Sequence, residues 1–568
     1  MAVTTNLKIS YLTNTLPRKS WISTYHSWNL SLLNSKSGSL HRKLSIMSVA
    51  LNDNKLSPLL TDDKTSSLDQ CRRRSQEALL NSSDPIETMK MIDSIQGLGI
   101  SHHLEDEINI QLDRICDWDA SRNLFATSLQ FRLLRHNDRP TSSDVFNKFL
   151  DKSGNFKESL TNDIWGMLSL YEASYLGTED EDILKKALEF SRTHLNELIS
   201  HMSPQIGYKH IVRSLTLPKH LRMARLEARN YMEEYSHASS QIPALLELAN
   251  LDSDMIQSLH QRELAEICRW WKELGLVDSL GFARDRPTEC FLWTLGIFPE
   301  PCHSNCRVEL TKTICILLVM DDIFDTYGRF EELVLFTKAI KRWDLDAVDD
   351  LPEYMKICYM ALYNTTHEIA YRIQKDRGLT AVSYLKRTWI DIFEAFLEEA
   401  KWFNSGYVPS YKTYLDNGVI TAGSCMALVH ATFLIGDDLS KETISMMKPY
   451  PRLFTCSGEI LRLWDDLGTS TEEQERGDNA SSIQCLMGEN NITDENEGRK
   501  HIRLLIGNLW RELNGLAMTK TLPLSVVKAS LNMARTAQVI YQHGDDKSTF
   551  SVDDYVQTLI FTSLPTSK

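Results

Sequence analysis

Two groups of acidic residues in the second half of the chain have types and spacings that suit metal binding. In the first group, the apolar run "ICILLVM" leads directly into Asp321, Asp322 and Asp325. Residues four apart share one face of an α-helix, so Asp321 and Asp325 would point the same way. Carboxylates that close repel each other unless a cation lies between them. Mg²⁺ or Mn²⁺ would suit these oxygen ligands, and a helix end whose acids face solvent is the alternative.

The second group lies in "LRLWDDLGTSTEE", which places Asp465, Thr469 and Glu473 at intervals of four residues. On a helix, these three side chains would form one stripe. Three hard oxygen ligands in line can hold a single magnesium ion, and the threonine hydroxyl adds a ligand without adding charge. The alternative is a capping run, because Asp, Thr and Ser also begin helices and fill loops.

Arginines near both acidic groups could bind an anion. Arg284 and Arg286 precede the first group in "RDR", and Arg462 precedes Asp465 by three residues. Guanidinium groups match phosphate oxygens in pairs and stay charged at any working pH. Two acidic stripes with arginines nearby therefore indicate a site for a polyanion bridged by metal ions. Taken alone, the arginines would be ordinary surface residues.

The elements that must position these residues are predicted to be helices. From about residue 60 onward the apolar residues recur with helical spacing, as Leu333, Phe336 and Ile340 do at i, i+3 and i+7. Alternating apolar runs and paired glycine turns, which would indicate strands, are missing. The sequence therefore predicts an all-α protein. A small polar stretch, "YSHASSQIPAL", suggests a boundary between helical domains at residues 53–250 and 251–568.

Together these motifs resemble those of the class I plant terpene synthases. "DDIFD" is similar to the aspartate-rich DDXXD motif of that family, "DDLGTSTEE" to its second metal-binding motif, and "RDR" has the family spacing. The likeness continues through "SLYEASYLG", "EEAKWFNSGYVPS" and "YQHGD". The resemblance implies a C-terminal helical bundle around a central active-site cavity. It also implies a lyase that ionises a prenyl diphosphate.

The resemblance also implies roles for single residues. Asp321 and Asp325 would bind two magnesium ions, and Asp465, Thr469 and Glu473 a third, with Mn²⁺ as a possible replacement. The substrate diphosphate would meet these ions and the three arginines, so that ionisation is the catalytic event. Trp293 and Tyr541 match positions that line the cavity in the family, and Phe324 would lie in the cavity wall nearby. Asp322 would pair with a basic neighbour. For each aromatic residue, ordinary core packing is the alternative.

The expected product is an acyclic tertiary alcohol. Many cyclising relatives carry a tandem-arginine motif with a tryptophan nine residues later, whereas here Ser82 and Ser83 stand at the tryptophan positions that follow Arg72-Arg73-Arg74. The chain thus resembles the linalool and nerolidol synthases, which act on geranyl and farnesyl diphosphate. A cyclic or olefinic terpene synthase is one alternative, and a prenyl-diphosphate-binding protein without turnover is another. After "YQHGD" the family pattern is broken by Asp546-Lys547-Ser548, which leaves the lid near Asp545 in doubt.

Composition limits the classes of partner that the protein could bind. The chain has 568 residues and a net charge of −14, which argues against nucleic acid as a partner. No apolar run approaches the roughly 18–20 residues that span a bilayer, so we expect no membrane partner. The partner would be the small-molecule substrate, and we expect a monomer. The eleven scattered cysteines indicate free thiols in a reducing compartment.

The first 52 residues differ from the rest. They are rich in serine and threonine, carry several lysines and arginines, and contain no acidic residue before Asp53. This composition is typical of an organelle transit peptide, and it lacks the compact apolar core of a secretory signal. We therefore expect a plastid (chloroplast) location. A disordered tail, or initiation at Met47, is the alternative and would leave the protein in the cytosol.

Overall fold

The computed structural model describes residues 62–120, 123–201, 206–436, 439–477, 480–543 and 552–562. Nearly all regular structure in these ranges is helical, and the one β-type pairing among them is an isolated bridge between Leu150 and Phe156. The expected all-α fold is confirmed. Residues 56–568 form one compact unit. The predicted transit segment, 1–52, lies outside the described residues.

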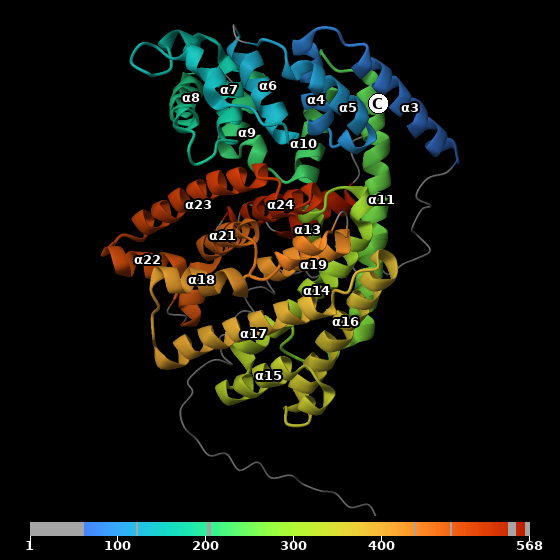
Figure 1. Ribbon diagram of the computed structural model, residues 1–568, viewed down its shortest axis with the longest axis vertical. Helices are drawn as coiled ribbons and strands as arrows, with labels where there is room; N and C mark the ends of the chain where they lie inside the picture. The colour runs from blue at the N-terminus through green and yellow to red at the C-terminus, as the bar shows by residue number, and fades with distance from the viewer. Residues whose placement is uncertain are drawn as a thin grey trace, which may run out of the picture. The chain divides into compact units, whose positions relative to one another are not determined.

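The first eight described helices pack around two apolar cores and lie together in Figure 1, coloured blue to green. They are α3 (Asp62–Leu80), α4 (Pro85–Gly97), α5 (Glu105–Cys116), α6 (Leu124–His136), α7 (Ile164–Ser174), α8 (Asp182–His201), α9 (Ile206–Thr216) and α10 (Ala224–Ser236). Short 3₁₀ turns join them at Ser101–His103, Ser143–Phe149, Glu158–Asn162 and Lys219–Leu221.

The later helices surround two further cores. They are α11 (Pro243–Leu274), α12 (Leu276–Ser279), α13 (Pro287–Ile297), α14 (Ser304–Asp322), α15 (Phe330–Arg342), α16 (Glu353–Arg377), α17 (Val382–Ser405), α18 (Tyr411–Thr421), α19 (Ser424–Ile435), α20 (Lys441–Ser445), α21 (Arg452–Arg476), α22 (Ser482–Asn490), α23 (Glu495–Met518), α24 (Leu524–Tyr541) and α25 (Val552–Val556). Two π turns, Ile323–Tyr327 and Gln557–Phe561, and two 3₁₀ turns, Pro301–His303 and Leu345–Val348, complete the set.

Helix α11 runs through the predicted boundary at residue 250. It begins at Pro243, just after the small polar stretch, and continues to Leu274, where Gly275 ends it in the left-handed conformation. In Figure 1 it reaches from the first group of helices into the second. The division into domains at 53–250 and 251–568 therefore stays a prediction.

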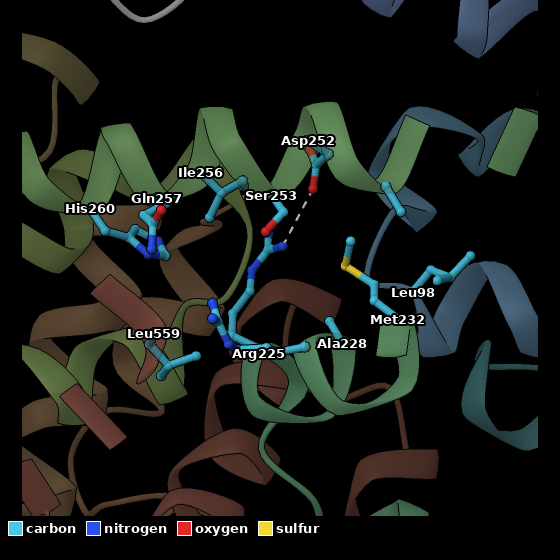
Figure 2. A pocket seen from close by; sticks show the side chains of 12 residues that line it. Leu98, Arg225, Ala228, Met232, Asp252, Ser253, Ile256, Gln257, His260 and Leu559 are labelled. Atoms are coloured by element: carbon cyan, nitrogen blue, oxygen red, sulfur yellow. Dashed lines mark ion pairs between the residues drawn. The ribbon is translucent and has the colours of Figure 1, made fainter. Parts of the chain in front are cut away.

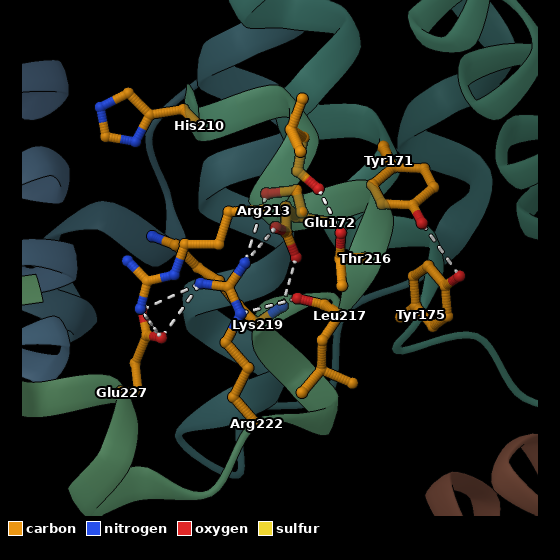
Figure 3. A network of polar contacts seen from close by, with 12 residues as sticks. Tyr171, Glu172, Tyr175, His210, Arg213, Thr216, Leu217, Lys219, Arg222 and Glu227 are labelled. Atoms are coloured by element: carbon orange, nitrogen blue, oxygen red, sulfur yellow. Dashed lines mark hydrogen bonds and ion pairs between the residues drawn. The ribbon is translucent and has the colours of Figure 1, made fainter. Parts of the chain in front are cut away.

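A polar network ties the ends of α7, α9 and α10 together (Figure 3). Glu227 of α10 accepts hydrogen bonds from Arg213 Nη2 at 2.5 Å and from Arg222 Nη1 at 3.0 Å. The backbone N–H of Lys219 donates to Glu172 of α7 at 2.8 Å. These side chains are mostly buried, so each charge depends on its partners for compensation.

Helix α14 carries the first acidic motif and is buried on nearly every side. Charged residues inside it are paired: Arg307 donates to Glu263 of α11 at 2.6 and 2.8 Å, although its side chain is fully buried. Glu309 accepts from Lys312 at 3.1 Å and from Arg372 of α16 at 2.6 Å. These pairs fix α14 against its neighbours, and so they fix the direction in which its C-terminal aspartates point.

One stretch, Tyr411–Ile435, is long and apolar enough to be compared with a membrane span, although no apolar run of that length was expected. In the structure it consists of α18 and α19, separated by Gly423 in the left-handed conformation. Of its most apolar 18-residue window, 89% is buried inside the protein. That is the profile of a core helix pair.

Candidate active site

The first acidic motif lies where α14 ends. Asp321 is half-buried and Asp322 is buried, both in the last turn of α14, whereas Asp325 is exposed in the π turn that follows. The N–H of Gly328 closes this π turn on the carbonyl of Ile323 at 2.7 Å. Such π turns are rare and frequent at functional sites. We expected Asp321 and Asp325 to lie one turn apart on a regular α-helix. Instead, α14 ends at Asp322 and Asp325 lies in the π turn.

Arg284 pairs with two carboxylates of this motif. Its Nη2 donates to Asp321 Oδ2 at 2.5 Å, its Nε lies 2.5 Å from Asp322 Oδ1, and its backbone N–H donates to Asp322 Oδ2 at 3.0 Å. Burial raises the pKa of Asp322 to about 6, against the lowering effect of the Arg284 charge. The expectation that Asp322 pairs with a basic neighbour is confirmed.

The second motif lies along α21. Arg462 Nη1 donates to Asp465 Oδ2 at 2.9 Å, and the hydroxyl of Thr469 donates to the backbone carbonyl of Asp465 at 2.8 Å. Asp465 and Thr469 are thus one turn apart on the same helix, as their spacing predicts. Glu473 belongs to the same helix, but its side chain lies outside the described residues.

Arg462 is held from the side of α18. Its Nε donates to the carbonyl of Gly418 at 3.1 Å, and its Nη2 donates to the hydroxyl of Thr421 at 3.0 Å. A Cβ at position 418 would lie 3.1 Å from the Arg462 side chain, so glycine permits this close approach. Asp466 is fully buried: its Oδ1 accepts from the Tyr414 hydroxyl at 3.0 Å and lies 3.5 Å from Arg462 Nη1, and its Oδ2 accepts from the backbone N–H of Ser482 at 2.7 Å. Asp466, the second aspartate of "DDLGTSTEE", therefore has a structural role.

The two motifs act on each other through space. Burial raises the pKa of Asp465, the charge of Arg462 opposes this, and the negative charge of Asp321 adds to the rise. Burial likewise raises the pKa of Tyr541, whose hydroxyl is hydrogen-bonded to Asp465 and which also lies in the field of Asp321. The Tyr541 ring lies 6.0 Å from that of Trp293, centroid to centroid. The structure thus brings Asp321, Asp465, Trp293 and Tyr541 to one region.

A further carboxylate in this region, Glu399 of α17, was missed as a site residue. Its Oε1 accepts from Thr421 Oγ1 at 2.8 Å and from Asn417 Nδ2 at 3.1 Å. Burial raises its pKa to about 7, the Arg462 charge lowers it, and the Asp321 charge raises it. The sequence held a signal, because Glu399 follows Phe396 by three residues on the apolar stripe of its helix. A carboxylate on an apolar stripe needs partners.

Two expected site residues are placed differently from the rest. The ring of Phe324 packs at 5.3 Å from those of Phe393 and Phe396 of α17, which favours the core-packing alternative. Arg286 is exposed just before α13, and among the described residues its guanidinium forms no hydrogen bond or ion pair. The segment around Asp545 lies outside the described residues.

The donors gathered here suit a hard divalent cation. Asp321, Asp465, Thr469 and Glu399 offer carboxylate and hydroxyl oxygens, which are the ligands that Mg²⁺ and Mn²⁺ prefer. The pKa values of Asp465 and Glu399 are raised mainly by burial, and an excess of negative charge from neighbouring carboxylates adds to the rise. Added cations would relieve this excess, so the residues present fit a magnesium site.

Comparison with known protein families agrees with this geometry. Residues 43–215 match the family described as "Terpene synthase, N-terminal domain", and residues 272–512 match "Terpene synthase family, metal binding domain". The first match begins inside the predicted leader, so the leader boundary stays a prediction. The second match includes both acidic motifs and all three arginines.

Individual proteins with known names are similar over most of the chain. A probable terpene synthase 11 of Ricinus communis is 61% identical over 87% of this chain and 86% of its own length. A geraniol synthase and an R-linalool synthase of Ocimum basilicum, both named chloroplastic, are 52% and 49% identical. These two matches cover 85% and 86% of this chain, and 84% and 85% of the respective relatives.

Solved structures extend the likeness to three dimensions. Isoprene synthase of grey poplar, in complex with three Mg²⁺ ions and a thiolodiphosphate, has a TM-score of 0.84 and 35% identity over 88% of this chain and 97% of its own. A limonene synthase with 2-fluorolinalyl diphosphate has a TM-score of 0.86 and 35% identity over 89% and 96%. With its all-α fold and its metal-binding domain, this chain belongs to the plant terpene synthase family.

Proposed function

We propose that this enzyme ionises an acyclic prenyl diphosphate and captures the cation with water to give an acyclic tertiary alcohol. The products would be linalool from geranyl diphosphate and nerolidol from farnesyl diphosphate, with diphosphate as co-product. The observation that carries the proposal is the convergence of Asp321, Asp465 and Glu399 with two arginines at one site. The 49% identity to an R-linalool synthase supports the choice of product.

The reaction breaks the bond between C1 and oxygen, and the electron pair leaves with the diphosphate. The oxygen of water then bonds to C3, and its proton passes to the diphosphate or to solvent. Magnesium ions, when bound by Asp321, Asp325, Asp465 and Thr469 together with Glu473, would supply positive charge that stabilises the departing anion.

Arg284 and Arg462 would also bind the diphosphate. In the structure Arg284 and Arg462 are each paired with an aspartate of a motif. Once those aspartates have other partners, the guanidinium groups become available to the diphosphate oxygens, where paired N–H donors match the phosphate geometry. Arg286, which is exposed nearby, would add a third cation. Stabilisation of charge on the leaving group acts mainly in the transition state.

The hydrocarbon part of the substrate needs a surface that does not react with a cation. Trp293 and Tyr541 offer aromatic faces next to Asp465. Each face can stabilise a passing cation by about 0.5–2 kcal/mol without forming a bond. The Tyr541 hydroxyl is hydrogen-bonded to Asp465.

A geraniol synthase activity is the second candidate. The 52% identity to a geraniol synthase favours it, and it requires only that water attacks C1 instead of C3. Cyclic or olefinic products and a binding protein without turnover remain as alternatives. We propose a plastid location, because both Ocimum basilicum relatives are named chloroplastic.

The test is an assay of the purified protein with Mg²⁺ and either geranyl or farnesyl diphosphate, read by chiral gas chromatography. Linalool or nerolidol as the main product supports the proposal. Geraniol selects the second candidate, mainly cyclic or olefinic products refute water capture, and binding without turnover refutes the enzyme. A fusion of residues 1–52 to a fluorescent protein tests the location, since a cytosolic signal would contradict plastid import.

A further inference from the structure

Two neighbouring histidines and a buried aspartate meet at a point that the acidic motifs do not involve. His102 and His103 lie in the 3₁₀ turn Ser101–His103, and Asp252 lies on α11. Asp252 Oδ1 is 3.0 Å from His102 Nε2 and 2.9 Å from His103 Nε2. One ligand atom from each residue lies within 4.8 Å of the others. The two imidazole rings are 4.2 Å apart and present the same nitrogen to one oxygen.

The burial of this group favours a cation. The Asp252 side chain is only 2% exposed, whereas those of His102 and His103 are 18% and 11% exposed. A buried carboxylate needs compensation, and a partly exposed pair of imidazoles leaves a route from solvent.

The second oxygen of this carboxylate has its own partner. Arg225 Nη1 lies 3.6 Å from Asp252 Oδ2 (Figure 2). The Nε of the same arginine donates to the carbonyl of Pro299 at 2.6 Å. Such an outer contact orients a ligating carboxylate and leaves its other oxygen for the ion.

A cavity opens beside Asp252. Its lining includes Ser253, Gln257 and His260, which come from the same helix as Asp252 (Figure 2). Neither ring nitrogen of His260 has a hydrogen-bond partner among the described residues, although the side chain is buried. A polar cavity of this kind can hold water. The lining of this cavity includes Asp252 and Arg225 but neither His102 nor His103.

We propose that His102 Nε2, His103 Nε2 and a carboxylate oxygen of Asp252 form a binding site for a transition-metal dication, with Zn²⁺ as the best fit. Ligands about 2.0–2.1 Å from a tetrahedral zinc ion are roughly 3.3 Å from one another, so each histidine nitrogen needs to move away from the Asp252 oxygen by only a few tenths of an ångström. Each imidazole would bind as the tautomer with its proton on Nδ1. Imidazole selects zinc over magnesium, which separates this site from the acidic motifs.

The bound ion would stabilise the fold and would take no part in the reaction. The ion would join the turn after α4 to α11, and through Arg225 it would reach α10 and the Pro299 carbonyl between α13 and α14. A metal ion that binds the folded chain and not the unfolded one adds its binding free energy to folding stability. Zinc is therefore expected to raise the thermal midpoint of unfolding.

The experiment uses the full chain without a histidine tag, stripped with a chelator and dialysed against Zn²⁺ or Mg²⁺, with metal content measured by mass spectrometry. The affinity for Zn²⁺ is measured by competition with a chromophoric chelator. We expect one zinc per chain and a zinc-dependent rise in the unfolding midpoint that magnesium does not give. The double variant His102→Gln/His103→Gln should lose both effects. Each single variant should bind zinc at least about tenfold more weakly.

The matched control is His237→Gln/His501→Gln, which removes two exposed histidines and should keep the zinc. Zinc binding that is equal in the wild type and the His102/His103 double variant would overturn the proposal, as would a wild type that binds none. Circular dichroism shows whether the double variant folds. If it does not, the two single variants decide the matter, since unchanged zinc affinity in both contradicts the assignment.

Discussion

Arg462 and Asp465 form an ion pair of 2.9 Å between residues one turn apart on α21. A similar pair joins Arg284 to Asp321 at the end of α14. Each acidic motif is therefore paired with an arginine that, under the proposed function, would also bind the substrate. These pairs offset part of the negative charge of the acidic motifs, and under the proposed function the two arginines would lie where the diphosphate binds.

The first prediction concerns the aspartate-rich motif. Asp321→Asn should lower kcat with geranyl diphosphate by roughly 100-fold or more, because a charged ligand at the site of the developing anion is lost. Asp350→Asn is the matched control, since Asp350 is exposed on a loop of the same region. Steady-state assays of both variants check this. Wild-type turnover in Asp321→Asn would remove Asp321 from the metal site.

The second prediction contrasts the two arginines of "RDR". Arg284→Gln should destabilise the protein, because it leaves buried Asp322 without its cation, by about 3–5 kcal/mol if Asp322 stays ionised. Arg286→Gln should leave stability unchanged, since Arg286 is exposed, yet raise KM if the residue meets phosphate. Urea unfolding and steady-state kinetics separate the two effects. Equal stability of both variants would show that the Arg284 pairs contribute little.

The third prediction follows from Glu399, whose pKa is raised to about 7. A carboxyl group whose pKa is higher in the folded state binds more protons when folded. Its contribution to stability is therefore present at low pH and is lost as pH rises from about 4.5 to 7. In chelator, the unfolding midpoint should fall over this window, and Glu399→Gln should reduce the slope. Mg²⁺ at pH 8 should restore the wild type more than the variant. The same slope in both proteins would contradict the assignment.

The fourth prediction tests the network of Figure 3. Glu227→Gln removes one of the two carboxylates that compensate Arg213 and one of the two that compensate Arg222, and it should cost about 1.5–3 kcal/mol of stability. Activity at low temperature should not change, because these residues lie on α9, α10 and the turn between them. Glu233→Gln, at an exposed position of α10, is the control. A lower kcat without loss of stability would point to a direct role in the reaction.

Much of this site could be predicted from sequence because helical spacing is regular. Asp465 and Thr469 share one face of α21 as their spacing implies, and the apolar run before Asp321 forms a buried helix. The π turn at Ile323–Tyr327 could not be predicted, since it depends on how the chain leaves α14. The packing of Phe324 could not be predicted from its place in the sequence either. Phe324 belongs to this π turn, and its ring packs against aromatic side chains of α17.

The pairing of acids with bases was only partly predictable. Arg462 is three residues from Asp465, so a local contact was foreseeable, whereas its bonds to Gly418 and Thr421 join segments far apart in the sequence. Glu399 was overlooked for the same reason: its partners come from α18. Contacts between distant segments require the tertiary structure.

The central claim is that the substrate ionises at carbon and that water is added at C3. Its most direct test is incubation of the purified protein with geranyl diphosphate and Mg²⁺ in ¹⁸O-labelled water, followed by chiral gas chromatography with mass detection. We predict linalool in which the hydroxyl oxygen carries the label. Unlabelled geraniol would indicate cleavage between phosphorus and oxygen instead, and that result, or a product without a hydroxyl group, would contradict the account.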